Sequence, residues 1–176
     1  MRSLLRYNRF NDDPDVLLLD AAEDGNINVI HEMIEERGAT KLDEAMAIAA
    51  QSGNLDIVLE MIAYGARDVD WAMATAAGEG HKKIVEEMFV RGASDFNTAM
   101  IAAASAGHID IVRLIIEIDK RRDKTIDFNQ GLIVAARAGY IDIVLIMVAR
   151  GARAFDLARA EAQKGGHMDI VWLLGN

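Results

Sequence analysis

The sequence predicts an all-α protein of the α-solenoid class, and three observations lead to this prediction. Only one proline occurs among 176 residues, while alanine and methionine are abundant, and this composition favours helices. No alternating run of apolar and polar residues is long enough to indicate a sheet. A segment built around "DIV" recurs, as in "SGNLDIVLEMI" (52–62) and "SAGHIDIVRLII" (105–116). Such recurrence indicates an elongated stack in which each unit buries its apolar face against its neighbours.

A glycine before each recurring segment fixes the register of six units. These repeat glycines are Gly25, Gly53, Gly80, Gly107, Gly139 and Gly166, at intervals of 28, 27, 27, 32 and 27 residues. We expect an N-terminal extension or cap over 1–14 and a single repeat domain over 15–176. The expected units are 15–42, 43–69, 70–96, 97–128, 129–155 and 156–176.

Each unit is expected to begin with a helix of roughly nine residues. Ten residues before each repeat glycine stands an aspartate or asparagine: Asp15, Asp43, Asp70, Asn97, Asn129 and Asp156. Because these side chains accept hydrogen bonds from free amides of a first helical turn, we predict that they are the N-caps. The helix that follows is rich in small side chains, as in "AMAIAA" and "AMIAAA", which allows adjacent units to approach closely.

A second helix is predicted directly after each repeat glycine. Asp56 and Asp110 lie in the first turn of two of these helices, where the positive helix end favours a carboxylate. Apolar residues at helical spacing supply the buried stripe. Most of these helices are expected to end at a glycine suited to a left-handed conformation: Gly38, Gly65, Gly92 and Gly151.

Unit four lacks this terminal glycine. Asp119 takes its place and five extra residues follow, so the helix is predicted to continue about one turn further. This insert holds the densest basic cluster of the chain: Lys120, Arg121, Arg122 and Lys124. One interpretation is a solvated helix end, where cations are favoured. The other is a docking point for an acidic partner, or a weak run of the nuclear-import type.

The units resemble ankyrin repeats. The segment "TAMIAAASAGHIDIVRLII" (98–116) is similar to the family pattern T-P-L-H-x-A-A-x-x-G-H-x-D/E-I-V-x-x-L-L, and "GASDFN" (92–97) resembles its G-A-D-x-N. The resemblance covers about residues 15–176. Ankyrin units have about 33 residues, and the residues missing here fall where the family has its β-hairpin. The resemblance therefore implies an α-solenoid of six ankyrin-like helix-turn-helix repeats without developed β-hairpins. Short repeats of this kind also resemble those of large DNA viruses that infect amoebae.

The last unit departs from the others in a way that is typical of a capping repeat. Arg159 stands where Met46 and Met73 stand in earlier units, and Glu161 and Gln163 also replace apolar or small residues. We expect these polar residues at the positions that would face a next unit. On this interpretation the chain is a complete array.

The recurring histidines invite a test for metal binding or catalysis. His81, His108 and His167 share one repeat position. Packed helices lie about 8–10 Å apart, whereas a zinc ligand must lie within about 2.1 Å of the ion, so equivalent histidines cannot share a metal. The ankyrin resemblance implies that they brace the turn by bonding backbone. Because no nucleophile–base pair, phosphate loop or calcium loop is found, we predict no enzyme activity, no cofactor and no metal site.

Composition narrows the class of partner. The chain has 28 acidic and 19 basic residues and a formal charge of −9, which makes nucleic acid an unfavourable partner. No apolar run approaches the ~18 residues that a membrane span needs. The lack of cysteine fits a cytoplasmic protein, which would be in the host cell if the chain is viral.

The ankyrin resemblance implies that first helices and turns line a concave face that binds another protein. Candidate partner-binding residues vary between units at these positions: Gln51, Trp71, Glu79, Thr98, Ser105, Gln130, Arg137 and Lys164. Trp71 is the strongest candidate for an interface anchor, although neutral variation of a surface would give the same variety. The alternative function is a structural or self-associating protein. It would form a homodimer through an apolar patch with Leu145 and Trp172 on the convex face of the C-terminal repeat.

Overall fold

The computed structural model describes residues 13–120 and 126–175, and within these ranges the chain is helical with no strand. The first helices of the units are α1 (Pro14–Asp24), α3 (Leu42–Gln51), α5 (Val69–Glu79), α7 (Phe96–Ala106), α9 (Phe128–Ala138) and α11 (Phe155–Gly165). The second helices are α2 (Ile27–His31) with its π-helical continuation η1 (Glu32–Glu36), α4 (Leu55–Tyr64), α6 (Lys82–Val90), α8 (Ile109–Lys120), α10 (Ile141–Ala149) and α12 (Met168–Gly175). The predicted all-α solenoid is confirmed.

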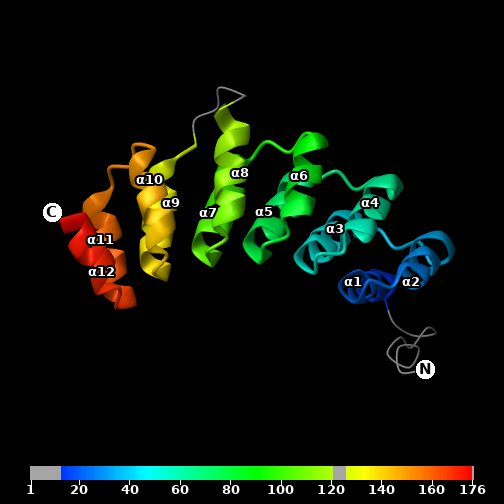
Figure 1. Ribbon diagram of the computed structural model, residues 1–176. Coiled ribbons are helices and arrows are strands. Elements are labelled where there is room, and N and C mark those ends of the chain that lie inside the picture. Colours follow the sequence, from blue (N-terminus) through cyan, green and yellow to red (C-terminus); the bar gives the residue numbers. More distant parts are fainter. Residues whose placement is uncertain (1–12, 121–125, 176) are drawn as a thin grey trace.

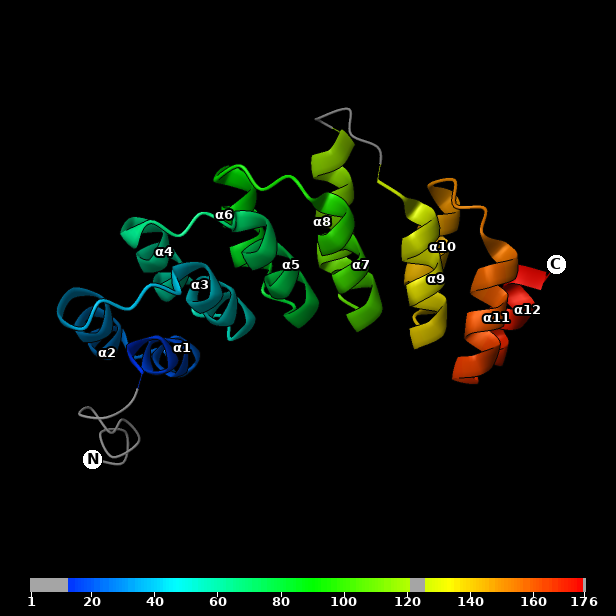
Figure 2. The same ribbon diagram turned by 180° about the vertical axis from the view of Figure 1, so that it is seen from behind.

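The helix pairs stand side by side in one arched row, with α1 and α12 at opposite ends (Figures 1 and 2). Connections between units, such as those from α6 to α7 and from α10 to α11, follow the outer edge of the arch. The turns within units lie along its inner edge. First helices pack against one another along the row, whereas second helices pack mainly against the first helix of their own unit.

Alanine forms much of the seam between neighbouring first helices. Ala72, Ala76, Ala99 and Ala103 are fully buried, as is Met73 between them. Isoleucine and valine of the second helices close the other side of each unit, and the buried residues form one continuous apolar cluster. The small alanine side chains at the seam allow the close approach that the sequence predicted.

The predicted N-caps were wrong by two residues. The observed N-caps are Asp13, Lys41, Asp68, Asp95, Asp127 and Ala154. Asp68 and Asp95, for example, accept hydrogen bonds from the amides of Trp71 (3.0 Å) and Thr98 (3.1 Å). Each residue predicted as a cap is instead the second residue of its helix. Its side chain is therefore already inside the first turn and is available to a different partner.

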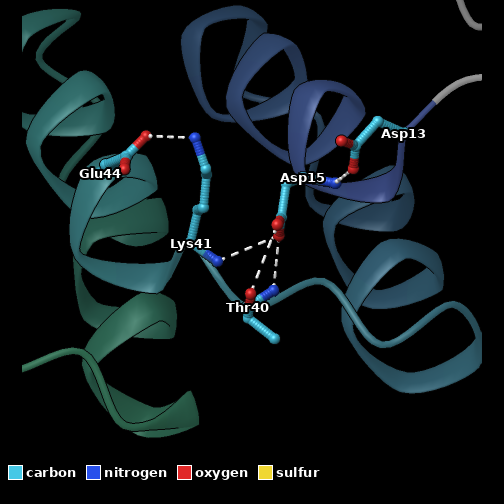
Figure 3. A network of polar contacts seen from close by, with 5 residues as sticks. All are labelled: Asp13, Asp15, Thr40, Lys41 and Glu44. Atoms are coloured by element: carbon cyan, nitrogen blue, oxygen red, sulfur yellow. Dashed lines mark hydrogen bonds and ion pairs between the residues drawn. The ribbon is translucent and has the colours of Figure 1, made fainter.

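That partner is the connection to the next unit. Asp15 accepts hydrogen bonds from the amides of Thr40 (2.6 Å) and Lys41 (3.1 Å), as Figure 3 shows. These bonds hold the pKa of the Asp15 carboxyl below its ordinary value. Equivalent bonds recur along the stack, and we call the residues that accept them the inter-unit clamps: Asp15, Asp43, Asp70, Asn97 and Asn129. In the last unit, Asp156 accepts from Arg159 of its own helix at 2.8 Å.

The longer second helix that was predicted for unit four, from its lack of a terminal glycine, is confirmed. Helix α8 has 12 residues, against 9 or 10 in α4, α6 and α10. The insert leaves the clamp intact, because Asn97 still accepts from the amide of Asp127 at 2.7 Å. Lys120 ends α8 and pairs with Glu117 at 2.7 Å. Arg121, Arg122 and Lys124 of the predicted basic insert lie outside the described residues.

The recurring histidines have a structural role that joins units. His81 Nε2 donates a hydrogen bond to the carbonyl of Gln51 at 2.9 Å, and His108 Nε2 donates to that of Gly78 at 3.0 Å. Both carbonyls belong to the first helix of the preceding unit. The ring of His81 covers Gly53, where an added Cβ would lie 2.6 Å from the ring. Bonding to backbone was predicted correctly, although it joins neighbouring units rather than the two helices of one turn.

Candidate partner-binding surfaces

The first helices expose one stripe of side chains each. Thr98 and Ser105 are seven residues apart on α7, as are Gln130 and Arg137 on α9. Because seven residues make about two helical turns, the two members of each pair lie on the same face. All eight predicted partner-binding residues are exposed, and we call the surface that they share the first-helix face: Gln51, Trp71, Glu79, Thr98, Ser105, Gln130, Arg137 and Lys164.

These residues fall into two groups along the helices. Trp71, Thr98 and Gln130 lie in first turns, next to the connections at the outer edge of the arch. The others lie at or near the C-terminal ends, beside the turns at the inner edge. The two groups are separated by about 11 Å, the rise of seven helical residues. A partner that contacts both groups must therefore lie along the helices rather than only against the inner edge.

Trp71 combines exposure with a fixed backbone. The residue is 43% exposed and lies on α5, where its amide is held by the cap Asp68. Its neighbour Asp70 is an inter-unit clamp that bonds the amides of Ser94 (2.5 Å) and Asp95 (2.8 Å). A large aromatic side chain on such a restrained segment loses little conformational freedom when it is covered by a partner.

At the C-terminal end of this face, three charged residues form one cluster. Glu161 Oε2 lies 2.6 Å from Arg137 Nε, and its Oε1 lies 2.5 Å from Lys164 Nζ. Hydrogen bonds from Lys164 and Arg137 hold the pKa of the Glu161 carboxyl below its ordinary value. Glu161 thus contacts the preceding unit. For Glu161, this corrects the expectation of a position that would face a next unit.

Leu145 on α10 and Trp172 on α12, the two residues of the predicted apolar patch, are both exposed, but they do not line the same furrow. Leu145 is 47% exposed and lines an open furrow of about 310 Å³. We call this the apolar furrow, and its lining residues are Leu145, Val148, Phe155, Leu173 and Leu174. Trp172 is 70% exposed but does not line the furrow. Leu173 and Leu174 of the apolar C-terminal segment "VWLLG", which the sequence places beside Trp172, do line it.

Over residues 13–120 and 126–175, no group of three or more histidine, aspartate or glutamate side chains could hold a metal ion. Within the same ranges, no helix has the length and apolar character required to cross a bilayer.

Comparison with known proteins agrees with the repeat geometry. Residues 72–157 match the family model of ankyrin repeats over three copies. The matched region runs from α5 to the start of α11, which includes the extended unit four. The match supports the similarity of these units to ankyrin repeats. The sequence is not significantly similar to any curated protein.

Proposed function

We propose that this ankyrin-like solenoid is a non-enzymatic module that binds another protein through its first-helix face. Ankyrin repeats are generally protein–protein interaction modules, and the family match supports that general role here. The observation that carries the specific proposal is the exposed stripe on successive first helices, with Trp71 as its large aromatic residue. Interfaces are typically anchored by tryptophan, tyrosine and arginine.

The inter-unit clamps support a binding role because they restrain the surface before a partner arrives. Asp43 bonds the amides of Arg67 (2.6 Å) and Asp68 (2.8 Å), and Asn129 bonds those of Arg153 (2.7 Å) and Ala154 (3.0 Å). Each clamp fixes the start of the next first helix relative to the one before it. A surface that is already ordered loses less entropy on binding than a flexible one.

The test begins with partners obtained by cross-linking in the native cell, followed by affinity measurements with purified proteins. Trp71→Ala and Arg137→Ala are each expected to weaken binding by about tenfold or more, since truncation of an interface anchor costs at least about 1–2 kcal/mol. Val90→Ala is the matched control, because Val90 is 75% exposed but lies at the end of a second helix. Unchanged affinity in both variants rejects the first-helix face.

A second candidate function is self-association through the apolar furrow and Trp172, favoured by the exposed Leu145, Trp172 and Leu173. Sedimentation equilibrium should then show a concentration-dependent dimer. Leu145→Glu should dissociate it, while Val16→Glu, at an exposed apolar position on α1, should not. A wild-type protein that stays monomeric at high concentration rejects this function.

The proposal also includes a cytoplasmic location and the likeness to the short repeats of large DNA viruses. Both rest only on composition and on a repeat length of 27 residues in most units. Fluorescence microscopy of the tagged chain tests the location, and exclusion from the cytoplasm would contradict it.

A further inference from the structure

The second helices leave furrows between neighbouring units, and the same repeat positions border each one. Helices α8 and α10 make few contacts with each other, because each packs on the first helix of its own unit. The gap between them is an open furrow of about 440 Å³. We call it the basic furrow, and its lining residues are Arg113, Ile116, Glu117, Ile146, Ala149 and Arg150.

The corresponding interval at the N-terminal end of the stack is bridged by its own side chains. His31 Nε2 lies 2.8 Å from Glu60 Oε1, and the Tyr64 hydroxyl donates to Glu35 at 2.5 Å. The bond to Glu35 raises the pKa of Tyr64 to about 12. The rings of His31 and Tyr64 also meet edge to face at 5.9 Å. In this interval, side chains of the two neighbouring second helices therefore pair with each other.

The basic furrow differs in both its charge and its floor. Ile116, Ile146 and Ala149 give it an aliphatic floor, and Arg113 is exposed at its border. Glu117 brings a carboxylate, but Lys120 pairs with it at 2.7 Å and Arg150 lies 3.8 Å away. Among the lining residues, two arginines thus accompany one carboxylate, which also pairs with Lys120. This local excess of positive charge lies in a chain whose formal charge is −9.

The apolar furrow adjoins the basic furrow across a single helix. Ile146, Ala149 and Arg150 of α10 line the basic furrow, while Leu145 and Val148 of the same helix line the apolar one. Packed helices lie about 8–10 Å apart, so the two furrows are separated by roughly that distance. An extended segment of about three residues, or two turns of a helix, spans it.

We propose that the two furrows together form a docking track for an acidic segment of a partner protein that carries a large apolar side chain. Carboxylates of the segment pair with Arg113 and Arg150, and guanidinium groups favour this geometry. The large apolar side chain enters the apolar furrow beside Leu145. Electrostatic attraction guides the acidic segment to the positive charge at the basic furrow. The track lies on the second helices and is distinct from the first-helix face.

A phage-displayed library of random peptides, selected on the purified full-length chain, tests this proposal. The expected result is enrichment of peptides that combine aspartate or glutamate with leucine, phenylalanine or tryptophan. An enriched peptide is then synthesised with a fluorescent label, and its affinity is measured by anisotropy. The double variant Arg113→Glu, Arg150→Glu should weaken binding on the order of tenfold or more, and Leu145→Ala should weaken it independently.

The matched control is the double variant Lys82→Glu, Lys83→Glu, which makes the same change in net charge at exposed sites on α6. This control variant should bind the peptide with wild-type affinity. Trp71→Ala should also keep wild-type affinity for the peptide, so the test of the docking track is independent of the test of the first-helix face. Circular dichroism checks that each variant is folded. The proposal is overturned if no peptide is enriched, if enriched peptides lack acidic residues, or if the double arginine variant keeps wild-type affinity. A second copy of this chain as the occupant, seen as a dimer that the arginine variant dissociates, would also overturn it.

Discussion

At the scale of single residues, the inter-unit clamps show what an aspartate in a first helical turn can do. Asp70 accepts two consecutive amides, of Ser94 (2.5 Å) and Asp95 (2.8 Å), which would otherwise have no partner within their own connection. Asn97 and Asn129 serve the same purpose in later units. The shared requirement is a short side chain with an acceptor oxygen, and a negative charge is not needed.

Asp70→Ala should therefore destabilise the fold, whereas Asp70→Asn should be nearly neutral. Loss of hydrogen bonds to a charged acceptor costs about 2 kcal/mol in free energy of unfolding. Urea denaturation followed by circular dichroism measures this difference. Wild-type stability of the alanine variant would show that the clamp contributes nothing, and equal destabilisation of both variants would show that the negative charge is required.

Gly53 and His81 provide a second prediction for single residues. Gly53→Ala places a methyl group 2.6 Å from the His81 ring at a residue with φ of 78°, so it should cost more than about 1 kcal/mol. Gly38→Ala is the matched control, because Gly38 has a similar φ of 72° and no atom within 4 Å of an added Cβ. The loss of stability in Gly38→Ala therefore measures the cost of the backbone conformation without a steric contact.

The double variant Gly53→Ala, His81→Ala separates the effect of the contact between the added methyl group and the His81 ring from the backbone strain. If contact with the ring matters, the glycine substitution should cost about 1 kcal/mol less in the His81→Ala background, as a double-mutant cycle measures. Additive free energies of unfolding would mean that the histidine does not require the glycine.

The position of the clamps could be predicted from sequence, but their partner could not. An aspartate or asparagine recurs at one position in six units, which identified a structural role. Local capping explains such a residue with partners two or three residues away. The true partners of Asp43 lie 24 and 25 residues further along the chain, in the next unit. A pattern within one unit contains no information on that distance.

At the scale of helices, the pairing of α9 with α11 predicts a pH-dependent contribution to stability. Glu161 on α11 bonds Arg137 on α9, and its pKa is lower in the folded state than the ordinary value of 4.5. The carboxylate therefore stabilises the fold above pH 4.5, and this contribution is lost as the pH falls through the lower folded pKa.

Glu161→Gln should lower the urea midpoint near neutral pH and should have no effect at pH values well below 4.5. Glu79→Gln, at the exposed C-terminal end of α5, is the control. High salt should reduce the difference at neutral pH, because exposed ion pairs are screened. A midpoint difference that is the same at all pH values would contradict this account.

For helix α8, the sequence predicted the length of the helix but not the surface that it forms with α10. Replacement of the terminal glycine by Asp119 and the longer interval together predicted its extension, and α8 does run to Lys120. The furrow between α8 and α10 was not predicted. It depends on which side chains bridge neighbouring second helices, as His31 and Glu60 do in the first interval, and equivalent positions hold different residues in each unit.

At the scale of the whole molecule, the repeat period predicted the linear stack of helix pairs. The arch and the orientation of its edges could not be predicted, because small rotations between units accumulate along the row. The exposure of the first-helix face was predicted for all eight of its residues. Their division between the outer and inner ends of the helices became visible only in the structure.

The linear arrangement of the units is the central claim, and small-angle X-ray scattering of the size-separated monomer tests it most directly. Six helix pairs spaced about 8–10 Å apart should give a radius of gyration of about 20 Å and an asymmetric distance distribution. A compact globule of 176 residues would give about 16 Å and a symmetric distribution. The larger value is our prediction, and the smaller one would contradict the stacked arrangement.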